Sequence, residues 1–322
     1  MKKLIHILIG ATMGMAEVVP GVSGGTIAFI SGIYERLINA IKAVDGQALQ
    51  YLLRGKWKSF FQKIDGVFLL FLLLGMIGGL LVGIFLISHL IEVYPIPMWA
   101  FFFGLILGSA IYIALKIKDW NLKSILLLIG GFGFAYFITR GMPMSGIDSP
   151  WAYFLAGTVA ISALILPGIS GSFILLILGM YTLVLHNVKS ILTSMDIQAL
   201  IKIAAFGVGI LIGLALFSRV LSWTFKNYKY PTYALLTGFI FGSLNKIWPW
   251  KIPTMGLDKE GQFIAIQPGQ VMDWEEIKIV AEQNVGPYHS AIQESHLATV
   301  IVLVVLGLAI IYGIAKVEKK AD

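Results

Sequence analysis

Two stretches of the sequence share one pattern of proline, glycine and serine. Residues 20–34 read PGVSGGTIAFISGIY, and residues 167–181 read PGISGSFILLILGMY. Each Pro-Gly pair lies inside a longer apolar stretch, which covers residues 4–41 in the first case and residues 151–188 in the second. Because Pro-Gly cannot continue a helix, each apolar stretch is predicted to form two helical limbs joined at a tight tip.

The composition indicates where these limbs lie. Of the 322 residues, 58% are hydrophobic and 13% are charged, whereas an ordinary soluble domain is about 25% charged. This predicts a polytopic membrane protein and excludes a disordered or collagen-like chain. The absence of cysteine excludes disulfides and thiolate sites, and the five histidines are scattered, so we expect neither a metal nor a cofactor. The net charge of +7 fits basic cytoplasmic loops better than nucleic-acid binding.

Broken helices at membrane depth are tolerated only where they are buried in protein or line a cavity. We therefore expect both apolar stretches to be re-entrant hairpins whose tips lie inside the membrane. The basic residues of the loops place both termini and residues 42–65 in the cytoplasm, so the first hairpin enters from the inside and the second from the outside. Six other apolar runs are predicted to be transmembrane helices: 66–91, 97–116, 122–139, 200–224, 231–249 and 296–316.

A second motif also occurs twice and in the same order. The pattern P-x-x-A-x3-G-x3-G-S begins at Pro97 and again at Pro231. The glycines at this spacing favour close helix packing, but packing alone does not explain the two Pro-Gly breaks. The motifs divide the chain into residues 1–140 and residues 150–322, each with one hairpin and three transmembrane helices. The odd number of crossings inverts the second half, so we predict an all-α membrane protein of two inverted repeats, an architecture typical of transporters.

The segment 250–295 is the only sizeable part predicted to lie outside the membrane, on the extracytoplasmic side. Asp273 with Glu276 three residues later predicts the start of a short helix, and the surrounding glycine, proline and glutamine predict loops. Two interpretations remain open for this segment: a passive connector, or a functional element that acts as a lid or docks a partner.

The residues after each Pro-Gly pair are the candidate binding site. Glycines allow a ligand to approach the backbone, and free N–H groups at the start of a helix together with hydroxyls suit an anion such as phosphate. Because the hairpins enter from opposite faces, the two tips can meet at one point. The alternative is a tight turn whose hydroxyls satisfy their own backbone. The candidate phosphate-binding residues are Gly21, Ser23, Gly24, Gly25, Thr26, Gly168, Ser170, Gly171 and Ser172.

Ionisable residues at membrane depth are functional candidates. Glu17 lies three residues before Pro20 and is a candidate proton carrier, with charge pairing or capping as the alternative; the equivalent residue of the second half is Leu164. Arg219, His89 and Arg36 are candidate contacts for an anionic headgroup, and snorkelling to lipid phosphate is the alternative.

The motifs EVVPGVSGGT at residues 17–26 and LPGISGS at residues 166–172 resemble those of the polyprenyl-phosphate transporter family, the undecaprenyl-phosphate translocases. The resemblance extends over essentially the whole chain. It implies a flippase of the bacterial cytoplasmic membrane that returns undecaprenyl phosphate, or a related polyprenyl phosphate, from the outer to the inner leaflet for recycling of the carrier lipid. Besides this lipid and the membrane, the expected partner is a coupling ion, either a proton or sodium.

Two other functions are alternatives to transport. The membrane undecaprenyl-pyrophosphate phosphatases also have inverted repeats, but their tips carry a Ser-Thr-Gly-His element and an arginine after Pro-Gly-x-Ser. Here Gly171 occupies the arginine position and no histidine follows Thr26, so the groups that hydrolysis needs are missing and no enzymatic activity is expected. A non-transporting assembly protein would not require two buried tips of this kind.

Overall fold

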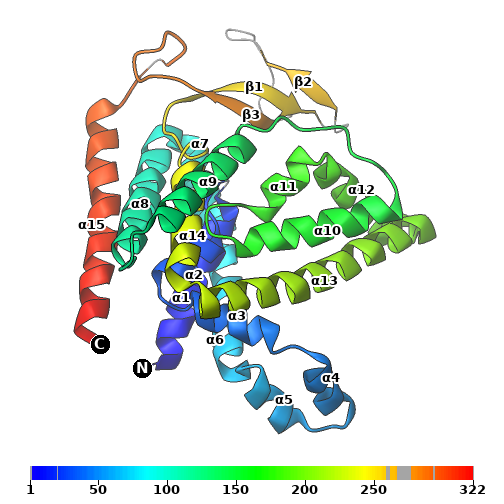
Figure 1. The fold of residues 1–322 in the computed structure, drawn as a ribbon. Helices are drawn as coiled ribbons and strands as arrows, with labels where there is room; N and C mark the ends of the chain where they lie inside the picture. Colours follow the sequence, from blue (N-terminus) through cyan, green and yellow to red (C-terminus); the bar gives the residue numbers. More distant parts are fainter. Residues whose placement is uncertain (1, 20, 259–261, 267–276, 293, 322) are drawn as a thin grey trace.

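The computed structural model describes residues 2–19, 21–258, 262–266, 277–292 and 294–321. The described chain is mostly helical, with one small sheet at the end of the molecule opposite both termini (Figure 1). The first half contains α1 (Lys2–Val18), α2 (Gly24–Ile30), α3 (Tyr34–Lys42), α4 (Gly46–Leu53), α5 (Trp57–Lys63), α6 (Gly66–Val82), the π-helical turn η1 (Gly83–Ile87), α7 (Ser88–Val93), α8 (Pro95–Leu115) and α9 (Leu122–Thr139). The second half contains α10 (Pro150–Ile165), α11 (Gly171–Ile177), α12 (Met180–Ser194), α13 (Ile197–Asn227), α14 (Lys229–Ser243), β1 (Lys251–Leu257), β2 (Phe263–Ala265), β3 (Lys278–Asn284) and α15 (Leu297–Ala321).

Both hairpins are broken twice rather than once. At each tip the glycine after the proline has a positive φ, 87° at Gly21 and 82° at Gly168. A second glycine with positive φ then ends the short returning helix, Gly32 after α2 and Gly179 after α11. Each returning limb was expected to be one helix; it is two, because a left-handed glycine ends a helix. In the second hairpin, α11 and α12 are bent by 102° at this point.

Within the described residues, four helices are long and apolar enough to cross a membrane: Gly66–Val93, Pro95–Leu115, Leu122–Thr139 and Ile197–Asn227. They correspond to four of the six predicted spans. The bent pair α11–α12 raises the number to five if it counts as one span. The predicted span 231–249 is too long, because α14 ends at Ser243 and turns follow it. Pro249 disfavours helix at the residue before it and cannot donate a backbone hydrogen bond.

The long helices pack in pairs that are equivalent in the two halves. Helix α1 packs against α6, and in the same way α10 packs against α13. The other two pairs join the halves: α8 packs against α15, and α14 packs against α9. Glycines of the repeated motif lie at both junctions, where Gly104 faces the backbone of Val304 and Gly238 faces the backbone of Leu128. Exchanging the two halves therefore maps each helix pair onto another.

The mostly helical structure agrees with the expected all-α membrane protein, and the segment after α14 adds one small sheet to it. This segment forms a three-stranded antiparallel sheet in the order β2-β1-β3, where loops were expected. In β3, which reads KIVAEQN, Ile279 is exposed and its neighbour Val280 is buried, as expected for a strand with one covered face. The short helix predicted at residues 273–276 lies outside the described residues.

Candidate functional site

The two hairpin tips contact each other directly. The Thr26 Oγ1 atom of the first tip accepts a hydrogen bond of 2.8 Å from the Gly168 N–H of the second. The Ser23 hydroxyl donates to the Leu164 carbonyl at 3.4 Å, and the Tyr34 hydroxyl donates to the Ile165 carbonyl at 3.1 Å. The chain thus brings together the two repeated motifs. Pro20, the proline of the first tip, lies outside the described residues.

The polar groups of the first tip are used within the protein. The Gly24 N–H donates to Glu17 Oε1 at 2.7 Å, and the Gly25 N–H donates to the Ser23 hydroxyl at 3.1 Å. Ser23 and Thr26 are completely buried. Space for a ligand at the backbone is also taken, since a Cβ added to Gly25 would lie 2.7 Å from the Ile165 carbonyl oxygen of the other tip. The first tip therefore has the geometry of a structural joint, and Glu17 caps it.

The serines of the second tip border a cavity. The hydroxyls of Ser170 and Ser172 are 2.9 Å apart and hydrogen-bond to each other. Ser170 precedes α11 but makes no capping hydrogen bond to it, in contrast to the equivalent Ser23 at α2. Both serines line a cavity of about 540 Å³, which we call the tip cavity and which is also lined by Glu17, Lys246 and Glu282. Gly171 does not line it; a Cβ there would meet the Ala160 carbonyl oxygen at 2.6 Å.

Two charged residues that line the tip cavity, Lys246 and Glu282, form a cluster with Lys251 of the sheet. The Nζ atoms of Lys246 and Lys251 lie 3.4 Å and 3.3 Å from the same oxygen of Glu282, Oε2. Lys246 lies in the turns after α14, Lys251 begins β1 and Glu282 belongs to β3. Lys251 is the most buried of the three, with a side chain 4% exposed and its ammonium 3.4 Å from the centre of the Trp99 ring.

The burial of this cluster shifts its titration. Burial lowers the pKa of Lys251 to about 8; Glu282 opposes this effect and the neighbouring Lys246 adds to it. For Glu282, burial acts to raise the pKa, but the two lysines outweigh burial and hold the pKa below its ordinary value. At neutral pH Glu282 is therefore a carboxylate and Lys251 an ammonium group.

A second cavity, of about 320 Å³, adjoins the first, and we call it the sheet cavity. It shares Phe173, Lys246, Val280 and Glu282 with the tip cavity and is also lined by Arg140, Asn245 and Lys251. The four shared residues thus stand between the two cavities.

The other predicted headgroup contacts lie apart from the tip cavity and do not line it. Arg36 makes a two-pronged ion pair with Asp65, at 2.6 Å and 3.1 Å, and its guanidinium lies over the Phe68 ring. Arg219 donates to the Ala215 carbonyl of its own helix at 2.6 Å. His89 is exposed on α7.

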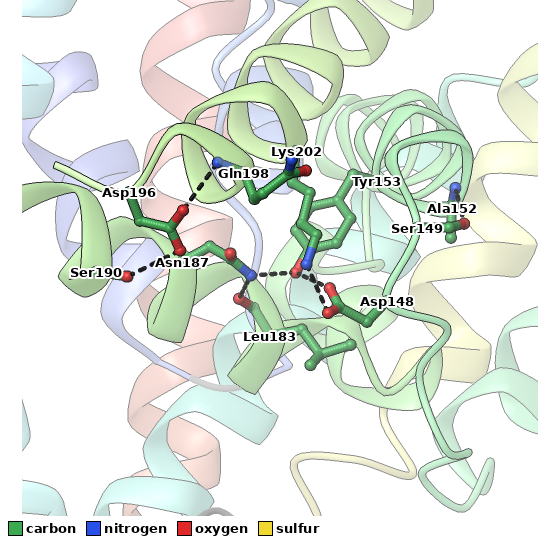
Figure 2. Close-up of polar contacts among 10 residues, drawn as sticks. All are labelled: Asp148, Ser149, Ala152, Tyr153, Leu183, Asn187, Ser190, Asp196, Gln198 and Lys202. Carbon is green, nitrogen blue, oxygen red and sulfur yellow. Dashed lines mark hydrogen bonds and ion pairs between the residues drawn. The ribbon is translucent and has the colours of Figure 1, made fainter. Parts of the chain in front are cut away.

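A polar network supports the second hairpin (Figure 2). Asp148 forms an ion pair of 2.6 Å with Lys202 of α13 and accepts a hydrogen bond of 3.2 Å from the hydroxyl of Tyr153 on α10. The same hydroxyl is contacted by Asn187 of α12, which also donates to the Leu183 carbonyl at 2.9 Å. These contacts tie α12 to α10 and α13, and so fix the far end of the bent pair that carries Ser170 and Ser172.

Sequence reasoning missed Lys246, Lys251, Glu282 and Trp99. One signal was present: Lys246 and Lys251 flank Trp248 and Trp250 at the predicted outer end of a span, where aromatic residues are common but lysines are less expected. Nothing local linked them to Glu282, because the sheet register brings that residue to β1.

The fold and the site define a polytopic helical membrane protein with two broken hairpins that meet tip to tip beside a charged cavity. A family model described as undecaprenyl phosphate translocase-like matches residues 13–263. The chain is 37% identical over 329 residues to a protein of Vibrio cholerae named polyprenyl-phosphate transporter, with 99% of this chain and 98% of the relative covered. It is 34% identical over 262 residues to a Staphylococcus aureus protein of the same name, with coverage of 77% and 87%. The chain therefore belongs to the undecaprenyl phosphate translocase-like family. No solved structure matches it.

Proposed function

We propose that this chain transports a polyprenyl phosphate, with undecaprenyl phosphate as the expected substrate, from the outer to the inner leaflet of the bacterial cytoplasmic membrane. The names of its relatives supply the substrate class. The observation that carries the proposal is the tip cavity, which places serine hydroxyls and a lysine beside one another between the hairpins and the sheet. Such groups suit a phosphate monoester.

In this proposal the two tips have different roles in phosphate binding. Ser170 and Ser172 contact the headgroup directly, because they line the cavity. Ser23 and Thr26 with the tip glycines position the second tip, because their hydrogen bonds and close backbone packing join the two tips. The polyprenyl chain stays in the lipid.

Alternating access would follow from inverted repeats. The exchange of helix pairs between the halves supports such a relation: α1–α6 corresponds to α10–α13, and α8–α15 corresponds to α14–α9. Both termini lie at the end of the molecule away from the sheet (Figure 1), and in our proposal that end is cytoplasmic. Arg36 and Arg219 would then act near the inner face, and His89 near the outer face.

Glu17 is the proposed coupling residue. Its carboxylate both accepts the Gly24 N–H and lines the tip cavity. Protonation would weaken that hydrogen bond to the first tip while removing a negative charge beside the bound phosphate. A single proton would thus affect both the joint and the site.

The test is a translocation assay in proteoliposomes. Undecaprenyl phosphate is placed in the outer leaflet, and its protection from an added, membrane-impermeant phosphatase is followed over time. We expect protein-dependent protection without release of phosphate before the phosphatase is added. Release of phosphate by the protein alone would indicate hydrolysis, and absence of protection would contradict transport.

A further inference from the structure

The cluster of Lys246, Lys251 and Glu282 is arranged like a site whose ligand is replaced by a side chain. Both ammonium groups approach one oxygen of Glu282, at 3.4 Å and 3.3 Å. Charge-assisted hydrogen bonds of this kind are usually about 2.7–2.9 Å long. One carboxylate oxygen shared between two lysines therefore satisfies neither at the best distance.

The charge balance of the cluster also favours an anionic ligand. Two lysines, with side chains 13% and 4% exposed, face one carboxylate, so one positive charge stays uncompensated within the cluster, and an unpaired charge away from water is costly. A phosphate monoester carries about −1.5 to −2 charges near pH 7 and offers three acceptor oxygens. Such a headgroup would match two ammonium groups better than Glu282 does.

The cluster lies between the two cavities, so a bound headgroup could contact polar residues of both. Lys246 and Glu282 line both cavities, with Ser170 and Ser172 on the tip side and Arg140 with Lys251 on the sheet side. The pairing of β1 with β3 is irregular between Pro253 and Met255, and Pro253 is the residue opposite Glu282. Irregularities of this kind aim a strand side chain away from the regular pleat.

We propose that Lys246 and Lys251 bind the phosphate of the headgroup, and that Glu282 is a competing carboxylate that occupies the two lysines when no headgroup is bound. A headgroup displaces Glu282 and in doing so opens the boundary between the sheet cavity and the tip cavity. The inference rests on the transport function proposed above and names the residues that first bind the substrate.

The experiment measures equilibrium binding to the full-length protein in detergent, with farnesyl phosphate as a short prenyl monophosphate and inorganic phosphate as the second probe. We expect Lys246→Gln and Lys251→Gln to weaken binding of farnesyl phosphate by about 10- to 100-fold, as for the loss of a hydrogen bond to a charged group. We expect Glu282→Gln to have the opposite sign and to tighten binding by about tenfold. Lys189→Gln, at an exposed lysine of α12 outside both cavities, is the matched control and should leave binding unchanged.

The reversal of sign separates a competing carboxylate from a structural ion pair. If the cluster only holds the sheet in place, all three substitutions weaken binding together with thermal stability, and the proposal is overturned. Unchanged binding in both lysine variants also overturns it. Should Glu282→Gln not fold, Glu282→Asp serves instead, because a shorter side chain lengthens contacts that are already long, and we expect smaller tightening.

The two probes assign the source of the phosphate. Tighter binding of farnesyl phosphate than of inorganic phosphate, with the same dependence on both lysines, assigns the site to a lipid headgroup; equal affinities support the site with free phosphate as its ligand. The translocation assay keeps the two proposals distinct. Translocation by the unaltered protein without the expected binding pattern overturns the inference alone, whereas the binding pattern without translocation overturns the transport function alone.

Discussion

The two hairpin tips have nearly the same sequence and different surroundings. In the first, Ser23 caps its helix and Thr26 binds the other tip, and both are completely buried. In the second, Ser170 makes no cap and lies with Ser172 on the wall of a cavity. The difference begins one turn earlier, where Glu17 caps the first tip and Leu164 stands at the equivalent position of the second. A repeated motif has thus given one tip whose polar groups are used within the protein and one tip whose serines line a cavity.

The largest loss of stability should come from substitution of Gly168, where the first tip contacts the second. Gly168 has a φ of 82°, and a Cβ there would lie 2.8 Å from the Phe239 carbonyl oxygen. We expect Gly168→Ala to destabilise the protein by about 3 kcal/mol or more, since strain and a backbone clash add. Gly55→Ala is the matched control, because Gly55 has a φ of 68° and nothing within 4 Å. It should cost about 1 kcal/mol, as measured by thermal unfolding in detergent. Equal losses of stability in the two variants would show that Gly168 is no more closely packed than a glycine in a surface turn.

Substitution of Glu17 should separate the two roles of the first tip. Glu17→Gln keeps an oxygen that can accept the Gly24 N–H, so we expect the fold and farnesyl phosphate binding to persist. Translocation driven by a proton gradient should fall by about tenfold or more, because an amide cannot carry a proton. Normal gradient-driven translocation by this variant would show that Glu17 only caps the first tip and does not carry the proton.

The pH dependence of binding tests the cluster of Lys246, Lys251 and Glu282. The pKa of Lys251 is lowered to about 8, mainly by burial, so its positive charge is present below that pH and lost above it. Glu282, whose pKa is held below its ordinary value by the two lysines, stays ionised throughout this range. The second ionisation of a phosphate monoester lies near pH 6. We expect farnesyl phosphate binding to be strongest between about pH 6 and pH 8 and to weaken by up to about tenfold per pH unit above that.

Lys251→Arg provides the control for this profile, because arginine stays charged at all accessible pH values and stacks on aromatic rings. It should remove the decline above about pH 8. A decline that is the same in this variant would come from another group.

The smallest effect concerns the network that holds the second hairpin (Figure 2). The ion pair with Lys202 holds the pKa of Asp148 below its ordinary value. Its contribution to stability is therefore present at neutral pH and lost as the pH falls through the lowered pKa. We expect Asp148→Asn to cost about 1 kcal/mol of stability at neutral pH, as for a partly exposed pair, and less in acid. Thermal unfolding at the two pH values measures this, and a loss of headgroup binding at full stability would contradict a supporting role.

Local patterns of sequence predicted much of this architecture. The Pro-Gly breaks located both hairpins, and the apolar runs located the four long helices. The extra breaks at Gly32 and Gly179 were visible only as repeated glycines, because their effect depends on a positive φ that sequence does not state. The sheet was missed, since β1 and β3 are stabilised by pairing with each other across a long connection.

The candidate site was predictable only in part, for the same physical reason. Ser170, Ser172 and Glu17, which line the tip cavity, could be singled out as candidates because they lie beside a recognisable break. The cluster of Lys246, Lys251 and Glu282 was not found, because it forms where a turn and two strands meet and no short motif joins these residues. The difference between Glu17 and Leu164 predicts that the two tips are not equivalent. Which tip borders a cavity depends on how the halves pack.

The most direct test of this account compares the two equivalent serines in parallel. Thermal unfolding and farnesyl phosphate binding are measured for Ser23→Ala and Ser170→Ala in the full-length protein. We expect Ser23→Ala to lower stability by about 1–2 kcal/mol through loss of a buried cap and to leave the affinity of the folded protein unchanged. We expect Ser170→Ala to keep its stability and to bind farnesyl phosphate several-fold more weakly. Equal effects of the two substitutions on binding, or weaker binding only in Ser23→Ala, would contradict the division of the tips into a joint and a binding surface.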